Sequence, residues 1–301
     1  MDRLARAEGT PSASTLNQSE WRARSAKHRE RLAPFAEERL ARQAAHIKHP
    51  VNDFLFEYFT YRPAELLRWS PGSDVLLEEG QPIDIAWREF EPCEGGLILP
   101  ASTFPVRRLK FLHWAIGYLE GIAERPPSFH CFGMHEWAMV YHAPEVRHVS
   151  TPLRLSPEAI AQVLDDEGLR CTHFDAYRFF TPAAVTLNRI PLTRAITDQH
   201  DQKGCIHVTM DLYKYAYKIA PWSSGEMIAD AFLLAWEARQ LDMRASPYDL
   251  CRFGLEPIRM ETRAGREEYV ERQRELVGRA EPIRERLIGE YHKLLDSKTE
   301  S

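Results

Sequence analysis

Residues 204–241 have the sequence GCIHVTMDLYKYAYKIAPWSSGEMIADAFLLAWEARQL, which predicts two consecutive helices over residues 204–219 and 223–241. The second helix opens on SSGE, in which Ser223 and Glu226 have the spacing of a capping box. In that motif two side chains bond backbone amide groups that the start of a helix leaves unpaired. These two helices make a mainly α-helical protein the expected fold.

The flanking sequence extends the helical prediction in both directions. Residues 19–48 are expected to form two helices divided at Pro34, because proline removes a helix donor and disfavours helical geometry in the residue before it. Further helices are expected between Pro50 and Pro63 and over residues 106–125, 156–166 and 263–295, the last of which Pro282 could divide, and LILP (97–100) is expected to form a strand.

The predicted organisation is therefore a single compact helical domain with a few short strands. Residues 1–15 are expected to be a disordered tail, residues 16–48 basic amphipathic helices, and residues 49–297 the main helical domain. The chain of 301 residues is 44% hydrophobic, which is enough for a substantial core.

Composition also limits the classes of function. The longest apolar runs fall far short of the ~20 residues that span a bilayer, and the first residues lack the apolar stretch of a signal peptide, so a cytoplasmic protein without a membrane partner is expected. Five cysteines without a C-x-x-C pair predict reduced thiols. The net charge of −5 argues against a protein that coats nucleic acid, although the basic residues of 19–48 could contact phosphate.

Three stretches each combine a histidine, a carboxylate and aromatic rings: FHCFGMHEWAMVYH (129–142), CTHFDAYRFF (171–180) and GCIHVTMDLYKYAYK (204–218). A carboxylate among apolar rings is desolvated, which suits it to proton transfer, and one that stays ionised can stabilise a positive centre. Flat aromatic faces suit a planar ligand such as a nucleobase. These groups match the needs of an enzyme that cleaves an N-glycosidic bond.

The stretches supply candidate site residues, provided that they converge in space. Asp175 is the predicted catalytic carboxylate, Glu136 or His135 its partner in proton transfer, and His173 a further catalytic candidate. The predicted substrate-binding residues are Phe174, Tyr177 and Trp137 as a stacking wall, Arg178 and Arg244 as anion contacts, and Asp211 and Tyr213. Each of these could instead be an ordinary buried group with a structural partner, as Asp211 could be by pairing with Lys214.

A metal site is the second chemical interpretation. No cofactor is expected under the first interpretation, but the chain has enough nitrogen and oxygen ligands for iron, manganese or zinc. The proposed ligand pool is His135, Glu136, His142, His148 and His173. Glu145 and His148 also have a carboxylate-x-x-histidine spacing, although H-E-x-x-H is absent.

The sequence lacks the common motifs of several large enzyme classes. The sequence contains no G-x-S-x-G, no Walker phosphate loop and no G-x-G-x-x-G, so serine-hydrolase, P-loop and Rossmann functions lose their usual support. In LDMRASPYDL (241–250), Asp242 and Arg244 are expected to form a buried ion pair, with anchoring of an anionic group by Arg244 as the alternative.

The chain resembles a little-characterised bacterial family, common in actinobacteria, whose members usually carry the label 3-methyladenine DNA glycosylase. The resemblance runs from about His49 to Leu287 through HPVNDFLFEYFTYRPAELLRWSPG, FGMHEWAMVYH, CTHFDAYRFFTPAAVTLN, GCIHVTMDLYKYAYK and LDMRASPYDL. It implies cleavage of the bond between a modified base and its sugar, and it assigns no catalytic residue. The sequence has no recognisable counterpart of the glycine-rich hairpin of helix-hairpin-helix glycosylases.

Three hypotheses follow. The first is a cytoplasmic N-glycosidase acting on a modified or damaged nucleobase, in DNA or in a nucleoside or nucleotide. The second is a metal-dependent enzyme that uses a cluster of histidines and carboxylates. The third is a non-catalytic protein whose basic amino-terminal helices and aromatic groove bind nucleic acid.

Overall fold

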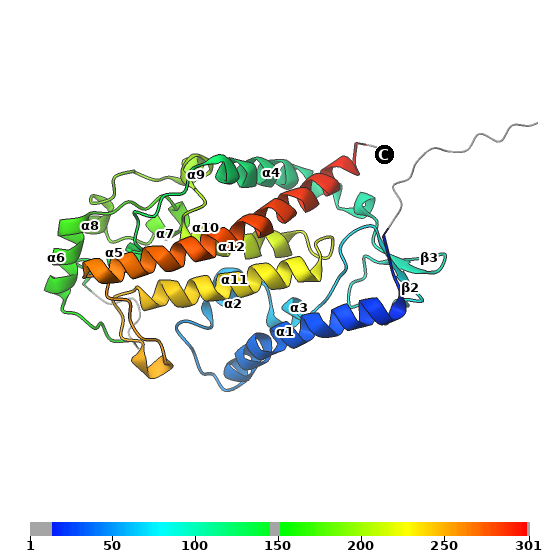
Figure 1. Ribbon diagram of the computed structural model, residues 1–301, viewed down its shortest axis with the longest axis horizontal. Helices are drawn as coiled ribbons and strands as arrows, with labels where there is room; N and C mark the ends of the chain where they lie inside the picture. Colours follow the sequence, from blue (N-terminus) through cyan, green and yellow to red (C-terminus); the bar gives the residue numbers. More distant parts are fainter. Residues whose placement is uncertain (1–13, 145–150, 300–301) are drawn as a thin grey trace, which may run out of the picture.

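The computed structural model describes residues 14–144 and 151–299, which form twelve α-helices, four short 3₁₀ helices and one four-stranded sheet (Figure 1). The α-helices are α1 Gln18–Ala44, α2 Phe54–Tyr58, α3 Pro63–Leu66, α4 Leu109–Glu124, α5 His135–Ala138, α6 Pro157–Glu167, α7 Phe174–Tyr177, α8 Pro182–Val185, α9 Thr197–His200, α10 Ile206–Lys218, α11 Gly225–Arg244 and α12 Arg263–Asp296. The strands are β1 Ser14–Leu16, β2 Val75–Glu78, β3 Glu91–Cys93 and β4 Gly96–Ile98. The mainly α-helical prediction is confirmed.

The long helices α4, α10, α11 and α12 form the centre of the molecule. Helix α10 packs against both α11 and α12, and α12 also packs against α4, which lies along its other side (Figure 1). Tyr213 of α10, Phe232 of α11 and Tyr291 of α12 are fully buried between them. Burying each apolar side chain of this size contributes about 1.5–3 kcal/mol, so these contacts hold the helices in place.

Helix α1 is one continuous helix, which corrects the prediction of two helices divided at Pro34. It begins at a capping box, in which the Asn17 side chain accepts from the Glu20 amide and the Glu20 side chain accepts from the Asn17 amide. An internal proline costs about 3 kcal/mol. Leu32 and Ala36, on either side of Pro34, are fully buried where α1 packs on α3 and α11, and this burial offsets the cost.

Two other local predictions change in the structure. Helix α12 runs through Pro282 without a break, because buried residues on both sides, Ala280 and Ile283, keep the segment packed on the core. The side chain that caps α11 is Ser224, which accepts from the Met227 amide, and not Ser223. The predicted capping box therefore does not form, because the residue three positions after Ser224 is Met227, whose side chain cannot bond the Ser224 amide.

The small sheet lies at one end of the molecule and has the order β1-β2-β4-β3 (Figure 1). Strand β1 is parallel to β2, and the other two pairs are antiparallel, with Leu77 opposite Leu97 and both fully buried. Strand β4 overlaps the strand predicted at LILP (97–100) in Leu97 and Ile98 only. Ser14 and Thr15, predicted to be part of a disordered tail, form β1, and residues 1–13 lie outside the described residues.

The short helices α5, α6, α7 and α8 gather towards the opposite end of the molecule (Figure 1). Their buried residues join those of α1 and of the long helices in a single hydrophobic core. In the described part of the chain, no helix is both long enough and apolar enough to cross a membrane. The end with the short helices holds the site described next.

Candidate active site

A pocket of about 420 Å³ opens where α2, α5 and α7 meet α10 and α11. Its aromatic lining consists of Phe54, Tyr58 and Phe179, and its polar lining includes His135, Glu136, Asp175, His207 and Arg239. All three stretches that combine histidine, carboxylate and aromatic residues in the sequence therefore contribute side chains to one pocket. This volume lies within the usual range for small-molecule sites.

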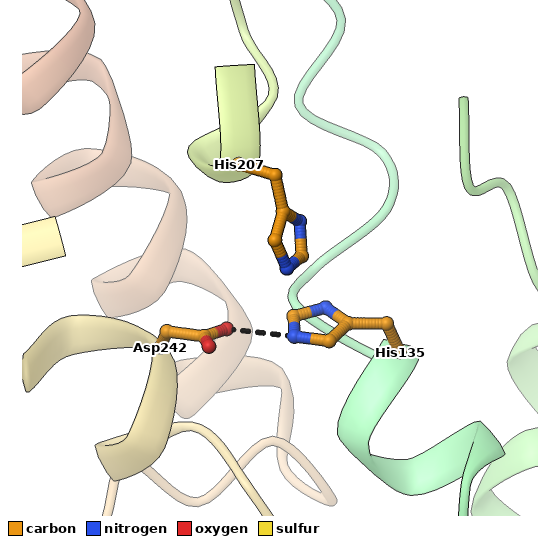
Figure 2. A group of neighbouring side chains, drawn as sticks. All are labelled: His135, His207 and Asp242. Carbon is orange, nitrogen blue, oxygen red and sulfur yellow. Dashed lines mark ion pairs between the residues drawn. The ribbon is translucent and has the colours of Figure 1, made fainter. Parts of the chain in front are cut away.

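Three side chains meet at the inner end of the pocket. His135 from α5, His207 from α10 and Asp242 from α11 point toward one another (Figure 2), and one ligand atom of each lies within 4.8 Å of the others. His135 Nε2 is 3.0 Å from Asp242 Oδ1, and the two imidazole ring centres are 4.3 Å apart. The two histidines line the pocket, while Asp242 is fully buried behind them.

Arg239 connects this cluster to Glu136. It lies three positions before Asp242, on the same face of α11, and its Nη1 donates to Asp242 Oδ2 at 2.7 Å and to Glu136 Oε1 at 3.1 Å. Its guanidinium packs over the ring of Phe54, 4.0 Å from the ring centre. Burial opposes ionisation of Asp242, but His135 and Arg239 outweigh burial and hold the pKa of Asp242 below its ordinary value.

Several polar atoms around the cluster lack an aligned hydrogen-bond partner. His135 Nε2, Asp242 Oδ1 and Glu136 Oε2 are all buried and have no aligned hydrogen-bond partner, although the first two atoms lie 3.0 Å apart. A buried polar atom left without a partner costs about 1–3 kcal/mol. His135 Nε2 and Asp242 Oδ1 face each other as an ion pair, so Glu136 Oε2 is the one of these three atoms that lacks a partner of either kind among the described residues.

His207 lies between two histidines. Its ring stacks on that of His173 at 5.1 Å with an interplanar angle of 1°, and His135 lies on the cluster side. Burial, reinforced by His135 and His173, holds the pKa of His207 well below its ordinary value, so its ring is neutral at pH 7. Its Nδ1 lies 4.0 Å from Cys205 Sγ, which leaves Nε2 for the cluster.

His173, a predicted catalytic residue, forms a separate pair behind the pocket lining. Its Nδ1 is 2.9 Å from Asp201 Oδ1, and Asp201 Oδ2 accepts a 2.5 Å hydrogen bond from the hydroxyl of Tyr118. Burial lowers the pKa of His173, but Asp201 outweighs burial and raises it above the ordinary value. The polar contact of the His173 side chain is therefore structural and directed to Asp201, while its ring face stacks on His207 of the pocket lining.

Asp175 lines the pocket, but the groups around its carboxylate differ from those predicted. Its carboxylate is 24% exposed, pairs with Arg178 Nε at 3.2 Å and Arg194 at 3.6 Å, and hydrogen-bonds the hydroxyl of Tyr58. The prediction of a carboxylate enclosed by apolar rings is corrected, because two guanidinium groups surround Asp175. Arg178, predicted to contact an anionic substrate group, is thereby occupied within the protein.

The predicted stacking wall does not line the pocket. Trp137 is fully buried and donates to the Ala245 carbonyl, Tyr177 packs on Phe180, and Phe174 lies under Arg194. Tyr213 is buried in the core, and Asp211 pairs with Lys214 at 2.9 Å, the structural alternative that the sequence offered. A four-residue helix such as α5 or α7 presents only part of its surface to the pocket.

The expected pair of Asp242 and Arg244 is wrong. Residues two positions apart lie on different faces of a helix, so Asp242 faces inward to His135 while Arg244 donates to the Glu256 carbonyl and lies 3.8 Å from Glu268. The two residues therefore belong to different surroundings. Arg244 takes no part in the pocket.

The predicted metal-ligand pool is only partly brought together. His135 belongs to the cluster and Glu136 lines the pocket, whereas the ring of His142 packs on Tyr141 at 4.2 Å and His173 pairs with Asp201. His148 and Glu145 lie outside the described residues. The sequence reasoning missed the grouping of His135 with His207 and Asp242, and the spacing of Arg239 and Asp242 on one helix face was the signal available for Asp242.

Comparison of the chain with models of protein families, with curated proteins and with solved structures finds no match. The chemistry of the pocket therefore carries the functional argument.

Proposed function

We propose that this pocket is the active site of a hydrolase that cleaves an N-glycosidic bond in a small nucleobase-containing compound. The observation that carries the proposal is the shared pocket of Glu136 and Asp175, from separate segments, with the rings of Phe54, Tyr58 and Phe179. Cleavage of this bond requires carboxylates near a sugar that gains positive charge, together with flat surfaces that hold the base.

The two carboxylates would have different roles, because their surroundings differ. Asp175 forms ion pairs at the pocket wall and can present negative charge to an oxocarbenium-like sugar or to an attacking water. Glu136 Oε1 is held by Arg239, while Oε2 is buried without a partner and is available for proton transfer. His135 lies next to Glu136 in the pocket lining.

The aromatic lining suits a planar base. The rings of Phe54 and Tyr58 are stacked at 5.2 Å with an interplanar angle of 8°, and both line the pocket with Phe179. Base stacking on such rings contributes about 1–3 kcal/mol per base. These rings replace the predicted wall of Phe174, Tyr177 and Trp137.

The size and charge of the molecule favour a nucleoside or nucleotide over duplex DNA as the substrate. Binding to duplex DNA depends on cationic side chains that are free to contact phosphate. The arginines of α1, the most basic segment, all pair with carboxylates of this chain: Arg22 with Asp84, Arg24 with Glu226, Arg29 with Glu37, Arg31 with Asp230, Arg39 with Asp53, and Arg42 with Asp53 and Glu38. This pairing also removes the main support for the hypothesis of a nucleic-acid-binding protein.

The proposal is tested by measuring base release. Purified protein is incubated with a panel of alkylated and unmodified nucleosides and nucleotides, and with alkylated duplex DNA, and free base is separated and quantified. Release from at least one small compound is expected, with a loss of about 10²–10⁴-fold in Asp175→Asn. Asp166→Asn, an exposed aspartate on α6, is the matched control and should retain full activity. No release from the small compounds, or full activity in Asp175→Asn, would overturn the proposal.

A further inference from the structure

We propose that His135, His207 and Asp242 bind one divalent transition-metal ion at the inner end of the pocket. The three side chains come from three different helices and converge on one point (Figure 2). One ligand atom of each lies within 4.8 Å of the other two. Two imidazoles and one carboxylate form a common ligand set for metal ions that keep further positions open to a substrate or water.

The shortest distance in the cluster suits two ligands of one ion. Metal bonds to histidine nitrogen and carboxylate oxygen are about 2.0–2.2 Å long, so two such ligands lie roughly 2.8–3.6 Å apart at octahedral or tetrahedral angles. His135 Nε2 and Asp242 Oδ1 are 3.0 Å apart. The two atoms form an ion pair across this distance, and a metal ion would replace that contact with one bond to each of them.

Burial adds a second, independent observation. Asp242 is 0% exposed and His135 is 6% exposed, and an unsatisfied polar atom at such a position is costly. A cation placed among the three side chains would satisfy His135 Nε2 and Asp242 Oδ1 at once. Because His135 and His207 also line the pocket, the remaining coordination positions would face a bound substrate.

Arg239 positions the carboxylate ligand. It bonds Asp242 Oδ2, which leaves Oδ1 directed at His135, and it bonds Glu136 Oε1, which leaves Oε2 at the pocket. Partners of this kind orient metal ligands in many sites. Arg239 supplies one positive charge against the two buried carboxylates of Glu136 and Asp242.

The chemistry of the ligands indicates which ions would bind. Nitrogen and oxygen ligands without a thiolate favour zinc, iron(II) or manganese over calcium and magnesium, which prefer oxygen alone. Cys205 Sγ approaches Nδ1 of His207, on the ring edge away from the expected ligand atom, and so stays outside this set. Only the role of the ion rests on the proposed hydrolase: it would lower the pKa of a coordinated water and supply the nucleophile for hydrolysis.

The test measures metal binding directly. Protein freed of metal with a chelator is titrated with Zn²⁺ by calorimetry and with Co²⁺ by visible absorption, which reports the ligand geometry. One ion per chain is expected. His207→Gln should weaken binding at least about 100-fold, and so should His135→Gln. His142→Asn, a histidine outside the cluster, should bind as the wild type does. Thermal melting of each variant checks that it is folded.

Three results would overturn the proposal. They are a wild-type protein without a stoichiometric site, a folded His207→Gln variant that keeps wild-type affinity, and weak binding that is equally present in every variant. Each would leave His135 and Asp242 as a buried ion pair only. Base release measured with and without chelator separates the two proposals, because metal binding without base release defeats only the hydrolase, and chelator-resistant base release without metal binding defeats only the metal site.

Discussion

Among the described residues, two buried histidine–aspartate pairs differ in how completely their hydrogen bonds are formed. His173 and Asp201 are 2.9 Å apart, and the second oxygen of Asp201 accepts from Tyr118. His135 and Asp242 are 3.0 Å apart, but His135 Nε2 and Asp242 Oδ1 lack aligned partners. The first pair lies behind the pocket lining, whereas His135 of the second lines the pocket.

The comparison shows that residue type and burial alone do not identify a functional pair. A polar group whose hydrogen bonds are complete contributes to the uniqueness and stability of a fold. A polar group that is buried beside a pocket and whose hydrogen bonds are incomplete lowers the stability of the fold. This cost is typical of sites arranged for a ligand. We therefore propose that the His173–Asp201 pair stabilises the fold and that the His135–Asp242 pair takes part in ligand binding at the pocket.

The largest effect is expected from removing the acceptor of the complete pair. Asp201→Ala leaves His173 and the hydroxyl of Tyr118 buried without their partner, so it should lower the free energy of unfolding by about 3–5 kcal/mol. Urea denaturation measures this. The exposed Asp198→Ala, in the same segment, should change the free energy by less than about 0.5 kcal/mol. A loss below about 1 kcal/mol in Asp201→Ala would remove the structural role from this pair.

The next effect concerns activity. His135→Gln should reduce kcat/KM for base release by about 10²–10⁴-fold, because it removes a proposed metal ligand from the pocket. His173→Gln should retain much more activity wherever it remains folded, which denaturation and near-ultraviolet circular dichroism can check. The reverse order of activities in two folded variants would exchange the roles of the two pairs.

The pH dependence of stability provides a third, smaller effect. The folded-state pKa of His173 is raised above the ordinary 6.5, so its contribution to stability is complete below pH 6.5 and is lost as pH rises through the raised value. The folded-state pKa of His207 is lowered, so its contribution is present above pH 6.5 and is lost as pH falls below it. Each proton contributes a slope of at most about 1.4 kcal/mol per pH unit.

Denaturation of the metal-free protein across this pH range separates the two histidines. His173→Gln should flatten the decline above pH 6.5, and His207→Gln should flatten the decline below it. If His173→Gln left the alkaline limb unchanged, the charged pair with Asp201 would be contradicted.

The smallest effect is expected at the aromatic lining. Phe54→Leu removes a ring that stacks on Tyr58 and lies under Arg239, and aromatic contacts of this kind contribute about 0.5–1.5 kcal/mol. KM for the best small substrate should therefore rise roughly 2–10-fold, with little change in kcat. Phe174→Leu, from the wall predicted by sequence alone, should leave KM unchanged. Equal effects of the two substitutions would place the substrate elsewhere.

Local signals in the sequence predicted most of the helices but not their continuity. The spacing of apolar residues located α4, α6, α10 and α11 to within a few residues. The prediction that Pro34 divides its segment was wrong, because burial of Leu32 and Ala36 against other helices outweighs the local cost of proline. That burial depends on residues distant in the sequence, which no local pattern contains.

The sequence predicted the types of residue that form the candidate site, but only some of the individual residues. His135, Glu136 and Asp175 were named from their stretches, and the structure places all three in one pocket. Phe54 and Tyr58 were not named as site residues, and Asp242 was assigned to a pair with Arg244, because the sequence gives neither the direction of a short helix nor the partner of a buried charge. Such relations are fixed only when α5, α7 and α11 pack together.

The most direct test of the difference between the two pairs is a crystal structure of the protein grown with Zn²⁺, with the ion located by anomalous scattering. One strong peak is expected about 2.0–2.2 Å from His135 Nε2 and Asp242 Oδ1, with His207 as the third ligand. No peak is expected at His173 and Asp201, whose facing atoms already pair with each other. A fully metal-loaded crystal with an empty His135–Asp242 site, or with zinc bound at His173, would show that the metal site is not formed by His135, His207 and Asp242.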